Sequence, residues 1–179
     1  MRLFVGIELP SPVKLKLKEL QLELKTQADR GRFVSPDNLH ITLQFLGEVP
    51  DAITKDIVLS LQKLPSEIPQ FSLGLGAFGF FGNKSPYRVA WVGLNGQLDV
   101  LNKLQQEVQL AMTELKLVKD EKSFKPHITL ARDVELPMKF QTKSAEYNTT
   151  FNVDHFSIIS SSLESGRRIY RSIHNFILL

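Results

Sequence analysis

The tetrapeptide HITL occurs at His40–Leu43 and recurs unchanged at His127–Leu130, in the other half of the chain. The residues around each copy, SPDNLHITLQFLG and FKPHITLAR, are rich in strand formers and favour β-strands. Side chains i and i+2 of a strand point to the same face. Each copy is therefore predicted to bury its isoleucine and leucine on one face and to present a histidine and a threonine together on the other.

The repeat supplies the side chains that acid–base chemistry on a phosphate requires. A threonine hydroxyl can donate a hydrogen bond to an anionic oxygen, and an imidazole exchanges a proton near neutral pH. With both polar faces in one cleft, one histidine can deprotonate the attacking oxygen while the other protonates the leaving oxygen, and each transfer contributes about 10²–10⁴-fold in rate. The other two histidines, His155 and His174, have no threonine two positions on and are interpreted as structural.

The remaining pattern predicts a helix before each histidine strand and further strands after it. A strand at 1–9 is followed by Ser11 and Pro12, which suit the start of a helix that ends before Gly31. Further strands are expected at 33–47, on both sides of a turn at 82–86, at 124–132, 151–161 and 169–178, and further helices at 50–64 and 101–115. This order predicts an α+β fold in which residues 1–179 form one compact body of two similar halves, with a seam between Leu64 and Asn95.

The composition is that of an ordinary globular protein, with 42% hydrophobic and 23% charged residues. The net charge of +3 is compatible with an anionic substrate but is far below that of a protein that binds nucleic acid by charge alone. No apolar run is long enough to span a bilayer, and the first residues do not fit a secretory signal. The chain has no cysteine, so disulfides, zinc–thiolate sites and thiol nucleophiles are excluded. We therefore expect a cytoplasmic protein with no membrane partner.

Competing chemistries have weaker support in the sequence. A metal site would need further histidine or carboxylate ligands beside each HITL, and neither the G-x-S-x-G nucleophile elbow nor a P-loop occurs. Residues 74–79 match the dinucleotide-binding spacing G-x-G-x-x-G, but strand and turn residues follow where that motif requires a helix. These glycines are interpreted as relief of crowding in a bent strand. We expect neither a cofactor nor a metal.

The motifs SPDNLHITLQFLG and FKPHITLAR resemble the two signatures of the two-histidine (2H) phosphoesterase superfamily. The most similar branch is that of the bacterial and archaeal RNA 2′,3′-cyclic phosphodiesterases, also called 2′-5′ RNA ligases. The segments RLFVGIELP and SSSLESGRRIYRSIHNF extend the resemblance over essentially the whole chain. Gly6 stands where an alanine is common in that branch, and the C-terminal segment is only loosely patterned there.

The resemblance implies a bilobal, duplicated α+β fold, with two antiparallel sheets facing a central cleft, helices outside, and one HITL in each lobe. It implies metal-independent opening of a terminal ribose 2′,3′-cyclic phosphate to a 2′-phosphate, with joining of RNA ends through a 2′-5′ linkage as the reverse reaction. His40 would be the proton donor to the departing 3′ oxygen and His127 the proton acceptor that activates water. Thr42 and Thr129 would hold the non-bridging oxygens. The near-symmetry of the motifs also permits the opposite assignment of acid and base.

Two further residues are candidates for substrate binding, and strand periodicity disfavours both. Relatives tend to use an arginine at the position of Arg132 near the phosphate, but a regular strand turns Arg132 away from His127. Phe45 could stack on a base, but a regular strand places it with Ile41 in the core, and core packing is favoured. Tyr170 is a weaker candidate for the nucleic-acid surface.

The expected partner is therefore an RNA end that carries a 2′,3′-cyclic phosphate, and we expect the protein to be monomeric. An alternative within the superfamily is a phosphodiesterase of small cyclic nucleotides or of ADP-ribose cyclic phosphate. A non-catalytic RNA-binding module is the alternative from another class, but it would not need the histidine pair and should expose more aromatic residues in basic surroundings.

Overall fold

The computed structural model describes residues 1–118, 123–137 and 147–179. Its strands are β1 (Arg2–Glu8), β2 (Arg30–Phe33), β3 (His40–Glu48), β4 (Phe71–Phe81), β5 (Tyr87–Gly96), β6 (His127–Glu135), β7 (Thr150–Val153), β8 (His155–Glu164) and β9 (Arg167–Ile177). The α-helices are α1 (Ser11–Gln27), α2 (Thr54–Leu61), α3 (Leu64–Glu67) and α4 (Leu98–Glu114), and short 3₁₀ turns lie at Pro36–Asn38 and Asp51–Ile53. Each HITL begins a strand, as predicted.

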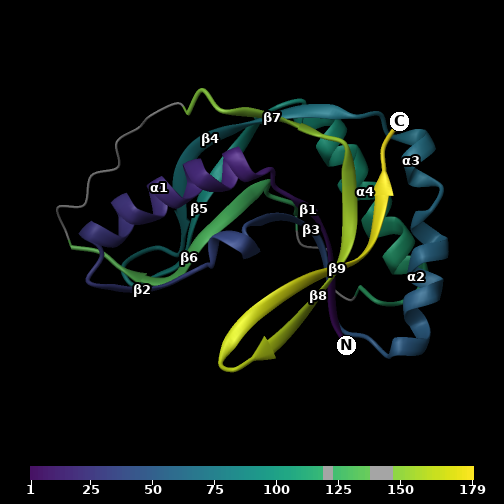
Figure 1. The fold of residues 1–179 in the computed structure, drawn as a ribbon, viewed down its shortest axis with the longest axis horizontal. Helices are drawn as coiled ribbons and strands as arrows, with labels where there is room; N and C mark the ends of the chain where they lie inside the picture. The colour runs from purple at the N-terminus through teal and green to yellow at the C-terminus, as the bar shows by residue number, and fades with distance from the viewer. Residues whose placement is uncertain (119–122, 138–146) are drawn as a thin grey trace.

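The strands form one curled, antiparallel sheet in the order β7-β4-β5-β6-β3-β1-β8-β9, with β2 paired to β6. The two histidine strands, β3 and β6, are neighbours in the middle of this order and pair at Ile41 and Ile128. One half-sheet extends from β6 through β5 and β4, and the other extends from β3 through β1 and β8 (Figure 1). The predicted α+β fold is confirmed, and the two expected sheets are the halves of one sheet that is continuous through the pair between the HITL strands.

The helices cover the outer face of this sheet, and the two long helices lie against opposite halves (Figure 1). Helix α1 follows β1, yet its Leu24 packs with Ala90 and Ala131 of β5 and β6. Helix α4 connects β5 to β6, yet it packs on β3 beside α2. Each half-sheet is thus covered by a helix that follows a strand of the other half, which ties the halves into one body.

The apolar residues of both HITL copies lie in the core, as predicted. Ile41, Ile128 and Leu130 are fully buried, and Leu43 is 3% exposed. They belong to a single hydrophobic cluster that also includes residues of α1, α2 and α4. Burial of a leucine or isoleucine side chain stabilises a fold by about 1.5–3 kcal/mol, so these residues hold the two central strands firmly.

Two predicted strands are each divided in the structure. The stretch at 33–47 contains the end of β2, a 3₁₀ turn that begins at a proline, and β3. The stretch at 151–161 is broken at Asp154. The residues before Asp154 form β7, which pairs with β4, and the residues after it form β8, which pairs with β1. Sequence periodicity does not show this break, because the residues on both sides of it are strand formers.

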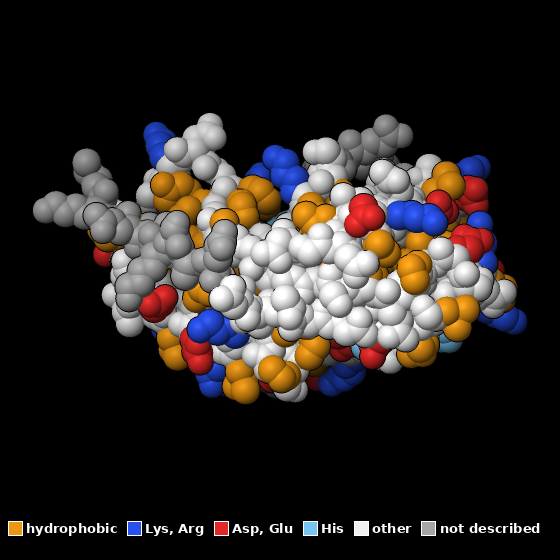
Figure 2. All heavy atoms as spheres, turned by 90° about the horizontal axis from the view of Figure 1, so that it is seen from above, with side chains coloured by type: hydrophobic (Ala, Val, Ile, Leu, Met, Phe, Trp, Pro, Cys, Tyr) orange, Lys and Arg blue, Asp and Glu red, His pale blue; other side chains and the backbone are white. Residues whose placement is uncertain are grey.

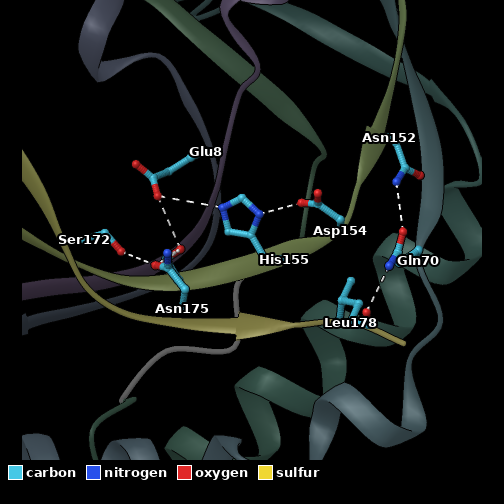
Figure 3. A network of polar contacts seen from close by, with 9 residues as sticks. Glu8, Gln70, Asn152, Asp154, His155, Ser172, Asn175 and Leu178 are labelled. Carbon is cyan, nitrogen blue, oxygen red and sulfur yellow. Dashed lines mark hydrogen bonds and ion pairs between the residues drawn. The ribbon is translucent and has the colours of Figure 1, made fainter.

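Polar side chains surround this crossing at Asp154 (Figure 3). The His155 ring lies 2.6 Å from the Asp154 carboxylate through Nδ1 and 4.0 Å from that of Glu8 through Nε2. Nearby, the Ser157 hydroxyl donates to Asn175 at 3.0 Å. These contacts join β1, β8 and β9, which agrees with the interpretation of His155 as structural.

The glycines at 74–79 lie in β4 and precede no helix, so the matching dinucleotide motif is incidental. A side chain at Gly79 would collide with the Trp91 ring, which confirms that the glycine relieves crowding. A Cβ at Gly6 would lie 2.7 Å from the Ile41 carbonyl oxygen of β3, so an alanine would push the two backbones apart. In the described part of the chain, no helix has the length and apolar character needed to span a membrane.

Candidate active site

His40 and His127 lie on one face of the sheet, at the junction of its halves. In the antiparallel register set by the Ile41–Ile128 pair, His40 lies opposite Thr129 and Thr42 lies opposite His127. The two histidines are therefore diagonal neighbours, and such neighbours are about 7–8 Å apart in a regular sheet. All four side chains are partly exposed, whereas the isoleucines between them are buried. The structure thus brings the two HITL motifs together on adjacent antiparallel strands.

Both imidazoles are oriented by the same hydrogen bond. Nδ1 of His40 lies 2.6 Å from the carbonyl oxygen of Asn38, and Nδ1 of His127 lies 2.6 Å from that of Lys125. A carbonyl oxygen only accepts, so Nδ1 carries the proton in each ring and donates it two residues back. Each neutral ring therefore presents Nε2, its basic nitrogen, to the polar face of the sheet. At His40 this nitrogen lies 2.9 Å from the Thr42 hydroxyl, which donates to it.

Aromatic rings flank both histidines. The His40 ring lies 4.7 Å from the Phe4 ring of β1 and 5.2 Å from the Tyr170 ring of β9, measured between centroids. The His127 ring lies 5.0 Å from Phe81 of β4 and 6.4 Å from Trp91 of β5. Sequence analysis identified only Tyr170 among these, because the contacts join distant strands and no local motif marks the other three residues.

Burial lowers the pKa of both histidines. The pKa of His40 falls from 6.5 to about 4, chiefly through desolvation, while its hydrogen bond to Asn38 opposes the shift. The positive charges of Arg132, His127 and Lys14 lower it further. The pKa of His127 is lowered by desolvation and by Arg132, against its hydrogen bond to Lys125. Both rings are thus neutral at pH 7 in the free protein, and an anion between them would raise both pKa values.

Arg132 lies on the side of the histidines, contrary to the expectation from a regular strand. Pairing of β6 with β5 shifts register, so that Trp91 pairs with Thr129 but Ala90 pairs with Ala131. Leu130 is the extra residue of this β-bulge, and both Leu130 and Ala131 are buried. Residues beyond the bulge change faces, which places Arg132 on the face of the sheet that carries His127. Its charge acts on both histidines.

Phe45 is not in the core, so the expectation that it packs there is wrong. Pairing of β3 with β1 shifts register after Thr42, which pairs with Gly6, whereas Gln44 pairs with Val5 and Phe45 with Phe4. Leu43 is the extra residue, and the bulge again reverses the faces beyond it. The Phe45 ring is 55% exposed and lies 5.9 Å from the Phe4 ring, between centroids. Phe45 and Arg132 therefore occupy equivalent positions, each five residues after its histidine.

Comparison with known proteins identifies relatives over the whole chain. A family model described as LigT-like phosphoesterase matches twice, over residues 7–91 and 92–170. The RNA 2′,3′-cyclic phosphodiesterase of Thermotoga maritima is 32% identical over 97% of this chain and 94% of its own length. That of Escherichia coli is 29% identical over 99% and 96%. The crystal structure of E. coli LigT complexed with 3′-AMP superposes with a TM-score of 0.86 at 29% identity, covering 99% of this chain and 97% of that one.

Proposed function

The chain belongs to the LigT-like phosphoesterase family and is a cyclic phosphodiesterase, and we propose that it opens RNA 2′,3′-cyclic phosphates through His40 and His127. One observation carries the mechanism. Two imidazoles with the same tautomer present Nε2 on one face, diagonally across the junction of two antiparallel strands. A phosphate between them has a proton acceptor on one side and, once one ring is protonated, a proton donor on the other.

The reaction follows from this geometry. His127 Nε2 takes a proton from water as the water oxygen attacks the phosphorus, and the bond between phosphorus and the ribose 3′ oxygen breaks in line. Protonated His40 gives its Nε2 proton to the departing 3′ oxygen, which leaves a 3′-hydroxyl and a 2′-phosphate. Proton transfers of this kind contribute about 10²–10⁴-fold each. His40 begins the next turnover neutral and His127 protonated, so solvent exchange restores the starting state.

The hydroxyls and the guanidinium stabilise the charged transition state. Thr42 and Thr129 donate to the two non-bridging oxygens. Thr42 lies opposite His127 on the neighbouring strand, and Thr129 lies opposite His40. The Thr42 hydroxyl must turn from His40 Nε2 toward the phosphate, which also frees that nitrogen to carry the second proton. Arg132 adds positive charge near both rings. Donors aimed at developing charge typically supply about 10²–10³-fold each.

Two finer points remain within the proposal. Relatives named RNA 2′,3′-cyclic phosphodiesterase support RNA as the substrate over small cyclic nucleotides, and reverse 2′-5′ joining would use the same groups. We also expect a monomer that works in the cytoplasm.

The experiment that tests this function identifies the product. An oligonucleotide that ends in a 2′,3′-cyclic phosphate is incubated with the protein in excess EDTA, and the position of the product phosphate is determined by NMR. We expect a 2′-phosphate at an undiminished rate, because the proposed groups need no metal. A 3′-phosphate would contradict the assignment of the 3′ oxygen as leaving group, and loss of activity restored by a divalent cation would contradict catalysis by the histidines alone.

A further inference from the structure

A groove of about 840 Å³ opens beside His127 and Thr42. It follows β3 from Thr42 to Glu48, and residues of β4, β5 and the segments on either side of 119–122 line its other walls. Six steps along a strand span about 20 Å, so the groove extends well beyond a phosphate bound between the histidines. Its volume lies in the upper part of the range of small-molecule sites. A cyclic phosphate alone does not fill it.

The lining combines cations with aromatic rings. Arg88, Lys116 and Lys125 line the groove, and within the described part of the chain Glu48 is the single carboxylate among its lining residues. Phe45, Phe81 and Phe124 are its aromatic residues. On the face shown in Figure 2, by contrast, the basic and acidic side chains of the described residues are interspersed. The excess of positive charge in the groove is therefore a local feature, which the net charge of +3 does not require.

This combination matches single-stranded nucleic acid. Cations alongside a groove track backbone phosphates, and exposed rings provide platforms on which bases stack. The Phe45 ring is 55% exposed, so its face is accessible to a stacking base. Lys125 Nζ lies 5.9 Å from the centre of the Phe81 ring, so charge and ring are adjacent at the His127 end.

Lys116 occupies a backbone position at which glycine is usual. The amide of Lys116 donates to the Thr113 carbonyl and that of Leu117 to the Met112 carbonyl, which is the Schellman pattern at the end of α4. Lys116 has φ of 58°, in the left-handed region that side chains disfavour. A lysine in this conformation places a cation at the groove at a conformational cost that glycine would avoid.

We propose that this groove binds the nucleotides that precede the cyclic end on the same RNA strand, with Arg88 and Lys116 on backbone phosphates and Phe45 beneath a base. The inference rests on the proposed function, because it takes the cyclic phosphate to lie between His40 and His127. The preceding nucleotides are covalently tethered to the bound end, so they reach the groove at high effective concentration, whereas a second strand must enter from solution.

The test compares adenosine 2′,3′-cyclic phosphate with a trinucleotide that ends in the same group. We expect Arg88→Gln and Lys116→Gly each to lower kcat/KM for the trinucleotide by roughly threefold to tenfold and to leave the mononucleotide unchanged. Each should also flatten the dependence of log kcat/KM on log salt for the trinucleotide by about 0.7. Lys116→Gly removes the cation while favouring the backbone conformation, so its effect is not one of misfolding. Lys103→Gln removes an exposed charge from α4 outside the groove and is the matched control.

The other outcomes overturn the proposal. An equal loss on both substrates would place these residues in catalysis, and no loss on either would leave the groove without a role in binding RNA. If the variants affect only the joining of a cyclic end to an added 5′-hydroxyl oligonucleotide, the groove holds an acceptor strand instead. Failure of the wild-type protein on both substrates would contradict the proposed function. In that case the affinity of the variants for a trinucleotide 2′-phosphate still decides whether the groove binds RNA.

Discussion

The chemistry of single residues depends on two nitrogen atoms, Nε2 of His40 and Nε2 of His127. Backbone carbonyls two residues upstream fix both tautomers, so the protonation state of Nε2 alone distinguishes acid from base. For turnover, one of the two Nε2 atoms must therefore carry a proton while the other is free. The sequence predicted this pair and its threonines from the repeated motif, because strand periodicity is local information. It could not rank the acidity of the two rings, which depends on burial by distant strands.

The pH dependence of turnover follows from the lowered pKa values. Both pKa values lie below the ordinary 6.5, that of His40 at about 4, so in the free enzyme both rings are neutral above pH 6.5 and gain protons only at lower pH. We expect a bell-shaped profile of kcat/KM with its maximum below pH 6.5. The profile of kcat should lie at higher pH, because the bound anion raises the pKa of both rings. Measurement of initial rates between pH 3.5 and 9 on a mononucleotide tests this, and a kcat/KM maximum at or above pH 7.5 would contradict it.

At the scale of secondary structure, a β-bulge lies at the end of the HITL motif in each of the two strands. Leu43 and Leu130 are the extra residues, and the bulges turn Phe45 and Arg132 to the side of the histidines. A regular alternation applied to the sequence places both side chains on the wrong face. Nothing in the letters ITLQFLG or ITLAR distinguishes a bulged strand from a regular one, because the bulge is fixed by the partner strands.

The bulge at Leu130 makes a prediction about Arg132. Replacement by glutamine removes the positive charge that lowers the pKa of both histidines, so both values should rise in an NMR titration of the imidazole signals. Turnover of cyclic phosphate should fall by about 10²-fold, because a charged donor near the phosphate is lost. Stability should change by less than about 0.5 kcal/mol, since the side chain is exposed. Unchanged histidine titration would show that the arginine points away, as a regular strand requires.

A buried glutamine holds the same bulge in place. Gln21 of α1 is 6% exposed, and its Nε2 donates to the carbonyls of Val34 at 2.7 Å and Leu130 at 2.8 Å. Gln21→Met should lower the free energy of unfolding by about 1–3 kcal/mol, because it removes both hydrogen bonds at a buried site. Urea denaturation measures the loss. Gln27→Met, at an exposed position of the same helix, is the control, and equal stability of the two variants would contradict the role assigned to Gln21.

At the scale of the whole molecule, the two halves of the sheet meet at one pair of residues, and each is covered by the other half's helix. The sequence predicted the α+β fold, the two histidine strands and a helix ahead of each. It did not predict that α1 and α4 each pack on the other half of the sheet, or that a strand is broken at Asp154. Both features depend on contacts between residues far apart in the chain. These long-range contacts determine how the two motifs meet. That the halves are two pseudo-symmetric lobes of a duplicated unit stays a prediction.

The most direct test of the two-histidine mechanism is the rate at which His40→Ala and His127→Ala open a 2′,3′-cyclic phosphate end, with circular dichroism to confirm that each variant folds. Each should lose at least about 10²-fold in kcat, because each removes one proton transfer. On a p-nitrophenyl phosphodiester, whose leaving group needs no proton, the His40 variant should lose much less than the His127 variant. The reverse pattern would exchange the acid and base roles. A cyclic-phosphate rate within tenfold of wild type in either variant would contradict the mechanism itself.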